Sequence, residues 1–373
     1  MSQPNETPLR IGLIASPWVR VPPANYGGTE LVVDLLARGL RARGHDVALF
    51  ATGDSTCPVE RHWLHERALG TTGDLTAELG QVEAAYDVLA PRVDLIHDHT
   101  LLGPVWAIAA GVDRPIVSTV HGPFTPTMAN HYEQIGDRVG IITISAHQRS
   151  TAPSVPVVGT VHHGIDVDGV PVGRGDGGYV LFLGRMSPEK GVHRAVDIAR
   201  TAGKRLLVAA KMWELEERRY FRDVVEPLLG PDVVHVGEVT GRRKHDLLAG
   251  AEALVNPIRW PEPFGLVMIE ALAAGTPVVS FREGAAPEIV SHGTTGYLCS
   301  DEDEMAAMLQ RLDAIDRRAC RLAARSRFSM TRMVRDHVAI YRRQLAGAPP
   351  TPELVEPGHR SSPLRFAAAG DAP

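Results

Sequence analysis

Two carboxylates eight residues apart frame the most informative segment of the chain. Glu262 lies in Trp-Pro-Glu-Pro-Phe-Gly, and Glu270 lies within the apolar stretch 266–274. The Pro-Phe-Gly break between them predicts a loop followed by a helix start, where free N–H groups and the helix dipole attract an anion. An unpaired carboxylate in an apolar helix is costly, which favours a binding role for Glu270 over a solvated one. The segment therefore predicts a site that holds a phosphate and a sugar ring together.

A second pair of charges follows a predicted strand at 179–184. Arg185 and Lys190 lie in Gly-Arg-Met-Ser-Pro-Glu-Lys-Gly, five residues apart, at a predicted helix start. Arginine offers a planar fork of donors and lysine a point charge, which together suit a diphosphate. Each charged hydrogen bond of this kind contributes ~1.5–3 kcal/mol. Two solvated surface cations are the alternative, and the strand end and helix start favour the diphosphate.

Two features of the first half also suit a binding site. Gly27 and Gly28 precede the first long helix, where a backbone without side chains approaches a ligand closely and helix N–H groups face an anion. A simple turn explains the two glycines equally well. His121 ends a predicted strand at 115–120 and precedes Gly122-Pro123, a position that suits a cleft, although capping or packing is an alternative.

Three segments resemble sets of metal ligands: His97-Asp98-His99, His162-His163 and Asp166-Val167-Asp168. Strand alternation places Asp98 on the side opposite to the two histidines, so the three side chains do not share a site. The two aspartates adjoin a glycine-rich segment and indicate a turn. We therefore expect no metal site and no cofactor.

Short apolar segments alternate with helical patterns along the chain. The predicted strands are 10–15, 46–51, 94–97, 115–120 and 140–144, followed by 179–184, 205–210, 233–236, 253–255 and 277–280. Apolar strands that alternate with helices predict parallel sheets covered on both faces. Two such series predict an α/β protein of two doubly wound, Rossmann-like domains that face each other across a cleft. Ligands of open α/β sheets bind at the carboxyl ends of the strands, so we expect the site in that cleft.

Composition suggests where the domains divide. Residues 166–178 contain five glycines and predict an interdomain linker and a hinge. We therefore expect a first domain at 1–172 and a second at 173–328. Apolar residues at helical spacing predict a further helix at 329–347. The tail 348–373 is rich in Pro, Ala, Gly and Ser, which predicts disorder.

The overall composition excludes several classes of protein. The 373 residues are 44% hydrophobic and 22% charged, with a net charge of −5, as in a globular protein without a nucleic-acid partner. No apolar stretch approaches the ~20 residues that cross a bilayer, and residues 1–9 lack a signal-peptide core. Cys57, Cys299 and Cys320 are few and widely spaced, as in a reducing compartment. We expect a cytoplasmic protein.

Together these segments resemble the retaining glycosyltransferases of family 4, the glycosyl transferases group 1, over about residues 10–345. The resemblance rests on Gly-Arg-x4-Lys-Gly, on Glu-Pro-Phe-Gly-x4-Glu-Ala followed by Gly-Thr-Pro-Val-Val, on the Gly-Gly loop and on His121-Gly122. It implies the GT-B fold, with the acceptor side in the domain at 1–172, the donor side in the domain at 173–328 and the helix at 329–347 crossing back to the first domain. It also implies transfer of a sugar from a nucleoside diphosphate sugar to an acceptor hydroxyl, with retained configuration and without a metal.

The resemblance assigns roles to the candidate residues. Arg185 and Lys190 would hold the donor diphosphate and stabilise the departing charge, and Glu270 would bind the ribose. Glu262 would contact the transferred sugar, and His121 would touch it near the reacting carbon. The backbone of Phe264, Gly265 and Leu266 would close on the sugar and phosphate, and Gly27 and Gly28 would approach the phosphate or the acceptor.

One segment departs from the family pattern. Many relatives have Gly-x-Gly after the second strand of the later domain, whereas this chain has Ala209-Ala210-Lys211-Met212. Lys211 either contacts phosphate in a modified way or is solvated.

Other functions and partners stay open at this point. A nucleotide-sugar epimerase on the same scaffold is one alternative, and a non-catalytic nucleotide-sugar binder is another. The acceptor, whether a sugar, a lipid-linked molecule or a small molecule, would bind around 18–25 and 121–131. Arg38, Arg41 and Arg43 on the first helix would suit peripheral membrane contact, although a solvated charged face explains them as well.

Overall fold

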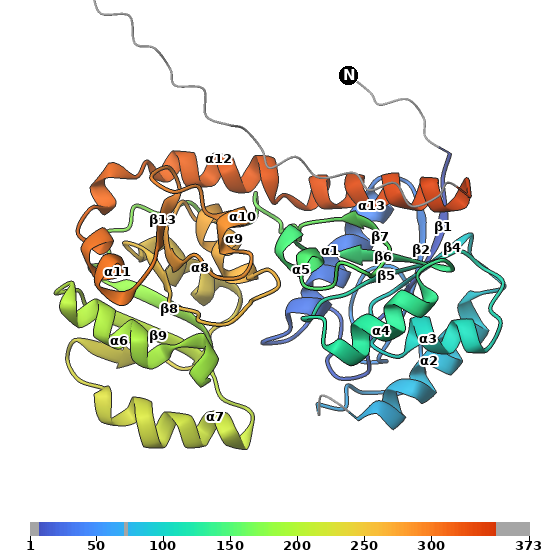
Figure 1. Ribbon diagram of the computed structural model, residues 1–373, viewed down its shortest axis with the longest axis horizontal. Coiled ribbons are helices and arrows are strands. Elements are labelled where there is room, and N and C mark those ends of the chain that lie inside the picture. Colours follow the sequence, from blue (N-terminus) through green and yellow to red (C-terminus); the bar gives the residue numbers. More distant parts are fainter. Residues whose placement is uncertain (1–6, 71–73, 348–373) are drawn as a thin grey trace, which may run out of the picture.

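Two parallel sheets with helices packed around them form the part of the chain that this computed structural model describes, residues 7–70 and 74–347 (Figure 1). The first sheet has seven strands in the order β3-β2-β1-β4-β5-β6-β7, and the second has six in the order β10-β9-β8-β11-β12-β13. In each sheet the strands that follow the first one (β1 or β8) are added on one side of it, and the later strands are then added on its other side, as in a doubly wound fold. The predicted α/β fold class is confirmed. The predicted tail at 348–373 lies outside the described residues.

The first half is built on the first sheet. Its strands are β1 (Arg10–Ile14), β2 (Asp46–Ala51), β3 (Glu60–Trp63), β4 (Leu95–Asp98), β5 (Ile116–Thr119), β6 (Val139–Thr143) and β7 (Val157–Thr160). Successive side chains point to opposite faces. Leu13 therefore packs in the cluster that includes α1 (Gly28–Ala42) and α13 (Met330–Leu345), whereas Ile14 packs on the other face. That second face is covered by α2 (Leu75–Leu89), α3 (Gly103–Ala109) and α4 (Pro126–Ile135).

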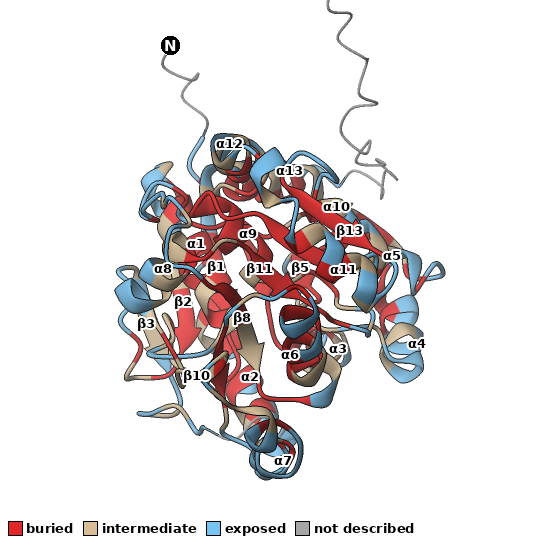
Figure 2. Ribbon diagram, turned by 90° about the vertical axis from the view of Figure 1, so that its left-hand side faces the viewer, coloured by how far each residue is buried: buried red, intermediate tan, exposed pale blue. Residues whose placement is uncertain are grey.

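The second half is built on the second sheet. Its strands are β8 (Val180–Arg185), β9 (Leu206–Lys211), β10 (Val233–His235), β11 (Leu254–Asn256), β12 (Val278–Phe281) and β13 (Gly296–Cys299). The surrounding helices are α6 (Val192–Thr201), α7 (Leu215–Tyr220), α8 (Gly241–Gly250), α9 (Leu266–Ala273), α10 (Ala286–Ile289), α11 (Glu302–Leu309) and α12 (Arg317–Arg327). Figure 2 shows buried strands at the centre and exposed outer helix faces.

The chain returns to the first half at its end. In Figure 1, α12 lies along the second half and α13 continues over the first. The Ser329 side chain accepts a hydrogen bond from the N–H of Arg332 and so caps the start of α13. Gly39 of α1 faces Val334 of α13 so closely that a Cβ at Gly39 would lie 2.4 Å from its side chain. The hydroxyl of Tyr341 reaches His97 of β4, at 2.7 Å. These contacts tie α13 to the first sheet.

The glycine-rich segment between the sheets is packed rather than free. The N–H groups of Gly173, Gly175 and Gly177 donate to carbonyls at the ends of α8 and α9, at 2.9–3.1 Å. A Cβ at Gly173 would lie 1.9 Å from the carbonyl oxygen of Ala249. Arg317 of α12 donates to the Gly173 carbonyl from the other side, at 3.0 Å. At Gly173, glycine is therefore required by the close approach of two backbones.

We expect Gly173→Ala to destabilise the protein by more than about 2 kcal/mol, because the added methyl overlaps backbone that cannot move aside. The matched control is Gly80→Ala within α2, where a Cβ would find only Leu64 at 3.7 Å. That change should instead stabilise by up to ~1 kcal/mol through helix propensity. Chemical denaturation of the three proteins measures both effects, and equal stabilities would contradict the packing argument.

Candidate active site

Two helix N-termini meet at the junction between the halves. Helix α1 begins at Gly28, after β1, and α9 begins at Leu266, after β11. A Cβ at Gly28 would lie 3.2 Å from the side chain of Leu266. Gly265 caps α9 with φ of 102°, a backbone conformation that favours glycine. The structure therefore brings Gly27, Gly28 and the Phe264–Gly265–Leu266 segment together, with free N–H groups from both helices at one place.

Lys190 and Glu262 form an ion pair beside the start of α9. Their side chains are 11% and 18% exposed, and the ammonium contacts the carboxylate directly. Lys190 also lies over the ring of Trp260, 5.3 Å from its centre. Both residues were predicted to lie in the site, but their ion pair with each other was not predicted. The pairing means that an anion arriving at α9 meets a lysine that already has a carboxylate partner.

Arg185 lies at the carboxyl end of β8 and is held less firmly. Its guanidinium donates to Glu189, at 3.1 Å, and both side chains are more than one third exposed. Exposed ion pairs of this kind contribute only ~0–1 kcal/mol. Arg185 can therefore exchange Glu189 for a stronger anionic partner at little cost.

Glu270 has a partner that the sequence did not reveal. Its carboxylate accepts a hydrogen bond from Lys244 of α8, at 2.6 Å, and the residue is 7% exposed. A lysine 26 positions earlier therefore offsets the cost of a carboxylate in this apolar helix, and the binding role of Glu270 stays a prediction. The pair lies one turn into α9, where the carboxylate remains available as an acceptor for a further donor.

Lys211 is buried and does not point into solvent. It is 6% exposed, pairs with Glu217 at 3.0 Å and lies 4.8 Å from the ring centre of Trp213. Tyr26 of the first half packs edge-on against Trp213, and its N–H donates to Glu238 at 3.1 Å. Trp213 donates to the same carboxylate at 2.8 Å. The solvated alternative for Lys211 is thus wrong, and its surroundings connect the two halves.

His121 lies just beyond β5 in a row of histidines. Its Nε2 shares a hydrogen bond with Nδ1 of His99, at 2.9 Å, and its ring stacks on His163 with centres 5.3 Å apart. His163 in turn contacts Phe264, which precedes α9, at 5.1 Å. Burial, with a smaller effect of His337, lowers the pKa of His121 to about 3. The imidazole is therefore neutral near pH 7, and it can donate or accept a hydrogen bond but carries no charge.

The segment His97-Asp98-His99 uses its side chains within the first half. The two nitrogens of His97 bond to Tyr341 and Thr119, at 2.7 and 2.8 Å. The carboxylate of Asp98 accepts from Tyr86 at 2.8 Å and from the N–H of Thr100 at 2.7 Å. These bonds fix the end of β4 beside His121.

Family models match both halves of the chain. A model of Glycosyltransferase Family 4 matches residues 26–153, and a model of Glycosyl transferases group 1 matches residues 177–314. The chain belongs to the family 4, group 1 glycosyltransferases. The expected GT-B fold is confirmed by the solved structures that resemble it.

Three known proteins illustrate the similarity. A glycogen synthase of Mycobacterium tuberculosis is 30% identical over 249 residues, 57% of this chain and 58% of that protein, so the match spans little more than half of the relative. The crystal structure of AviGT4, a glycosyltransferase involved in avilamycin A biosynthesis, is 27% identical with a TM-score of 0.70, covering 91% of this chain and 99% of that one. The Anabaena protein Alr3699/HepE, in complex with UDP and glucose, is 20% identical with a TM-score of 0.71, covering 90% and 99%.

The first half of this glycosyltransferase-family protein contains a residue that sequence reasoning missed. Glu30, in the first turn of α1, is 7% exposed and faces a cavity of about 290 Å³ that also borders His99 and His121. An acidic residue in the first turn of a helix ordinarily stabilises the helix start. Glu30 does not do so as a cap, because no side chain forms a capping hydrogen bond at the start of α1. Burial raises the pKa of Glu30 to about 7. No side chain within residues 7–70 and 74–347 forms an ion pair or hydrogen bond with this carboxylate.

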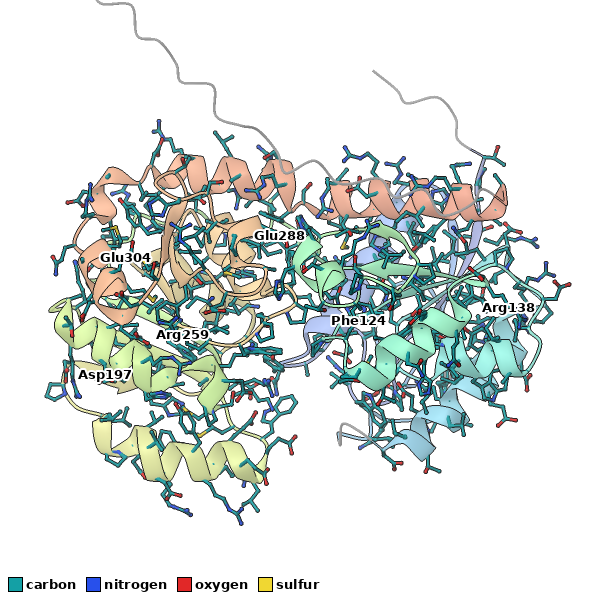
Figure 3. All side chains as sticks on the ribbon, in the orientation of Figure 1. Phe124, Arg138, Asp197, Arg259, Glu288 and Glu304 are labelled. Carbon is teal, nitrogen blue, oxygen red and sulfur yellow. The ribbon has the colours of Figure 1, made fainter. Side chains whose placement is uncertain are left out.

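A carboxylate of the second half holds the first half at another point. Glu288 of α10 accepts hydrogen bonds from the N–H groups of Ala146 and His147, at 2.8 and 2.7 Å, at the start of α5 (Ala146–Ser150). It also bonds to Nε2 of His162 at 2.7 Å. Ser145 donates to the carbonyl of Pro263, at 2.6 Å, in the loop before α9. Figure 3 labels Glu288 at the junction, below the meeting point of α12 and α13.

No helix in the described part of the chain is both long enough and apolar enough to cross a bilayer. Arg38 on α1 pairs with Asp34 at 2.9 Å. Peripheral membrane contact through this helix stays a prediction.

We expect Glu30→Gln to stabilise the protein more at pH 8 than at pH 5. Because burial raises the pKa of Glu30, the folded state holds the proton more tightly than the unfolded chain. Stability from this group is therefore present at low pH and is lost as pH rises from about 4.5 to about 7. The variant should gain about 1–3 kcal/mol over the parent at pH 8 and little at pH 5.

Chemical denaturation at the two pH values measures this difference. Glu83→Gln on the exposed face of α2 is the control, since it removes the same charge from a solvated position. A variant equally stable to its parent at both pH values would show that Glu30 does not have this buried, unpaired state.

Proposed function

We propose that the protein transfers a sugar from a nucleoside diphosphate sugar to an acceptor hydroxyl, retaining the anomeric configuration and requiring no metal ion. The single observation that carries the proposal is the meeting of two helix N-termini at Gly28 and Leu266, with Lys190 and Arg185 beside them. Such a place stabilises a dianionic leaving group without a cation from solution.

The donor would occupy the second half. Its diphosphate would take the N–H groups of α9 and the cations of Lys190 and Arg185, since a doubly charged group competes well with Glu262 and Glu189. Glu262, released from Lys190, would then accept hydrogen bonds from hydroxyls of the transferred sugar. Negative charge that develops on the departing diphosphate would be stabilised by groups already in position.

The similar proteins support this donor class. The Anabaena structure was solved with UDP and glucose, and the Mycobacterium relative is a glycogen synthase. UDP is a nucleoside diphosphate, and glucose is a sugar, so the Anabaena complex contains both components of the proposed donor class. The neutral His121, which reaches the start of α9 through His163 and Phe264, would meet the sugar on the side of the first half.

A direct assay tests the proposal. A thermal-shift screen of nucleotides and nucleotide sugars identifies the donor, and incubation with that donor and candidate acceptors in EDTA should give a product whose anomeric proton coupling matches that of the donor. Inverted product or full dependence on added metal would contradict the mechanism. A rearranged sugar formed without any acceptor would indicate an epimerase, and tight binding without turnover a non-catalytic binder.

We expect Lys190→Met to lower kcat/KM for transfer by about 10²–10³, the usual loss when one preorganised charge at a leaving group is removed. Lys204→Met is a matched control, because Lys204 pairs with Glu252 in the same half, with both side chains 25% exposed. The control should keep its activity within about twofold. A similar loss in both variants, measured in the same transfer assay, would mean that the effect is not specific to the site.

We expect Glu270 to distinguish ribose from deoxyribose. A carboxylate that accepts from the ribose hydroxyls gives the nucleoside diphosphate an advantage of about 5–50-fold in affinity over its 2′-deoxy form. Glu270→Gln should remove most of that advantage, whereas Lys204→Met should keep it. Calorimetric titration of both ligands into the three proteins provides the comparison, and an unchanged preference in Glu270→Gln would exclude the ribose role.

A further inference from the structure

The cavity in the first half has the size of a single sugar ring. It lies beyond the carboxyl ends of β1, β4 and β5 and has a volume of about 290 Å³. At ~30 Å³ per water molecule this space holds about ten waters, close to the twelve heavy atoms of a hexose. Thr29 and Glu30 at the start of α1 form part of its wall, so it adjoins the place where α1 meets α9.

The walls of the cavity carry hydroxyls and one carboxylate but no cation. The residues with hydroxyl, carboxyl or imidazole groups that line it are Ser16, Thr29, Glu30, His99, Thr100, Thr119, His121 and Tyr132, and neither lysine nor arginine is among the lining residues of this described region. Burial lowers the pKa of His99 and of His121, so both rings are neutral near pH 7. An anionic group placed here would disfavour the ionised form of Glu30, which is about half populated near pH 7, and no cation in the lining would compensate either charge.

The cations lie on the other side of the junction. Arg185, Lys190, Lys211 and Lys244 all belong to the second half, at or near the carboxyl ends of its strands or on the neighbouring helix α8. In the first half, Glu30 occupies the positive end of α1 and so offsets the dipole there. Recognition of phosphate is thus assigned to one half and recognition of uncharged groups to the other.

Two polar atoms in the cavity lack partners in the described chain. Nε2 of His99 and Nδ1 of His121 are buried without a hydrogen bond. The other two nitrogens of these histidines share one hydrogen bond. Whichever ring donates in that bond, the pair is left with one free N–H and one free acceptor nitrogen. Hydroxyl groups, which both donate and accept, satisfy such a set.

The geometry points to this cavity as the acceptor subsite for an uncharged, polyhydroxylated ring, a free sugar or cyclitol, with Glu30 as the residue that selects it over a phosphorylated one. This inference rests on the proposed function, because it supposes a donor bound to the second half. Buried polar groups without partners are rare in folded proteins, and His99 and His121 supply two of them within one cavity, beside the buried Glu30.

The first experiment compares matched acceptors. The full-length protein and its donor are incubated with glucose, mannose, galactose and myo-inositol, and with a phosphate ester of each. We expect at least one uncharged compound to accept the sugar, with kcat/KM at least tenfold above that of its phosphate ester. A preference for the phosphate esters, or donor hydrolysis by water with no transfer to any uncharged compound, would overturn the inference.

The second experiment uses Glu30→Gln with the acceptor found in the first. Its KM for the acceptor should rise at least tenfold, while its KM for the donor changes less than twofold. Glu83→Gln should change neither value. An acceptor KM that is unaltered in Glu30→Gln would overturn the role of Glu30, even if the uncharged acceptor is preferred.

The two proposals fail in different ways. If no nucleotide sugar binds to the protein or is consumed by it, the proposed transferase function is wrong and the acceptor subsite falls with it. If the donor is consumed and its sugar goes preferentially to phosphorylated acceptors, the transferase function stands and only the present inference is wrong.

Discussion

The approach of two helix N-termini, at Gly28 and Leu266, is the constraint on which the rest of the site depends. Each terminus carries about half a positive charge, so the two repel unless anionic groups lie nearby. Glu30 lies in the first turn of α1, and Glu262 lies in the loop before α9. These carboxylates offset the helix ends while no ligand is bound. A diphosphate would supply the same compensation at α9 with more charge and better geometry.

This electrostatic balance explains the ion pairs of the second half. Lys190 with Glu262 and Arg185 with Glu189 bring extra cations to the helix ends together with their own counter-charges. The net positive charge around α9 therefore stays small until a ligand displaces the carboxylates. Because the released Glu262 becomes a hydrogen-bond acceptor at the same moment, binding of the diphosphate and recognition of the sugar are linked through one exchange of partners.

The order of strands and helices was accessible from the sequence because the inner strands are continuous apolar segments. The strands that were not predicted, β3, β7 and β13, each lie at the edge of a sheet. β3 reads Glu-Arg-His-Trp and has no apolar pattern, whereas β13 is fully buried but spans only four residues; the edge strand β10 was predicted. Edge position is a property of the assembled sheet, so local sequence carries little signal for it.

The candidate residues of the site could be predicted from the sequence, but the ion pairs between them could not. Lys190 and Glu262 are 72 positions apart, and Lys244 and Glu270 are 26 apart. Such contacts depend on which strands are neighbours and how each helix is rotated, which spacing along the chain does not specify. Glu30 was overlooked for a different reason: acidic residues are common in the first turn of helices, and only its burial beside a cavity separates it from the ordinary case.

Two of the contacts between the halves differ in kind. Glu288 binds two N–H groups at the start of α5 and the ring of His162, all in a region tied to the crossing helix α13 through Arg332, which donates to the His162 carbonyl at 2.7 Å. The contact of Tyr26 with Glu238 and Trp213 is a single N–H bond and one ring edge, and Tyr26 is 40% exposed. The Lys211 ammonium also lies over the Tyr26 ring, 5.6 Å from its centre. The Glu288 contact therefore consists of hydrogen bonds to three groups beside the crossing helix, whereas the Tyr26 contact is partly exposed and rests mainly on its ring.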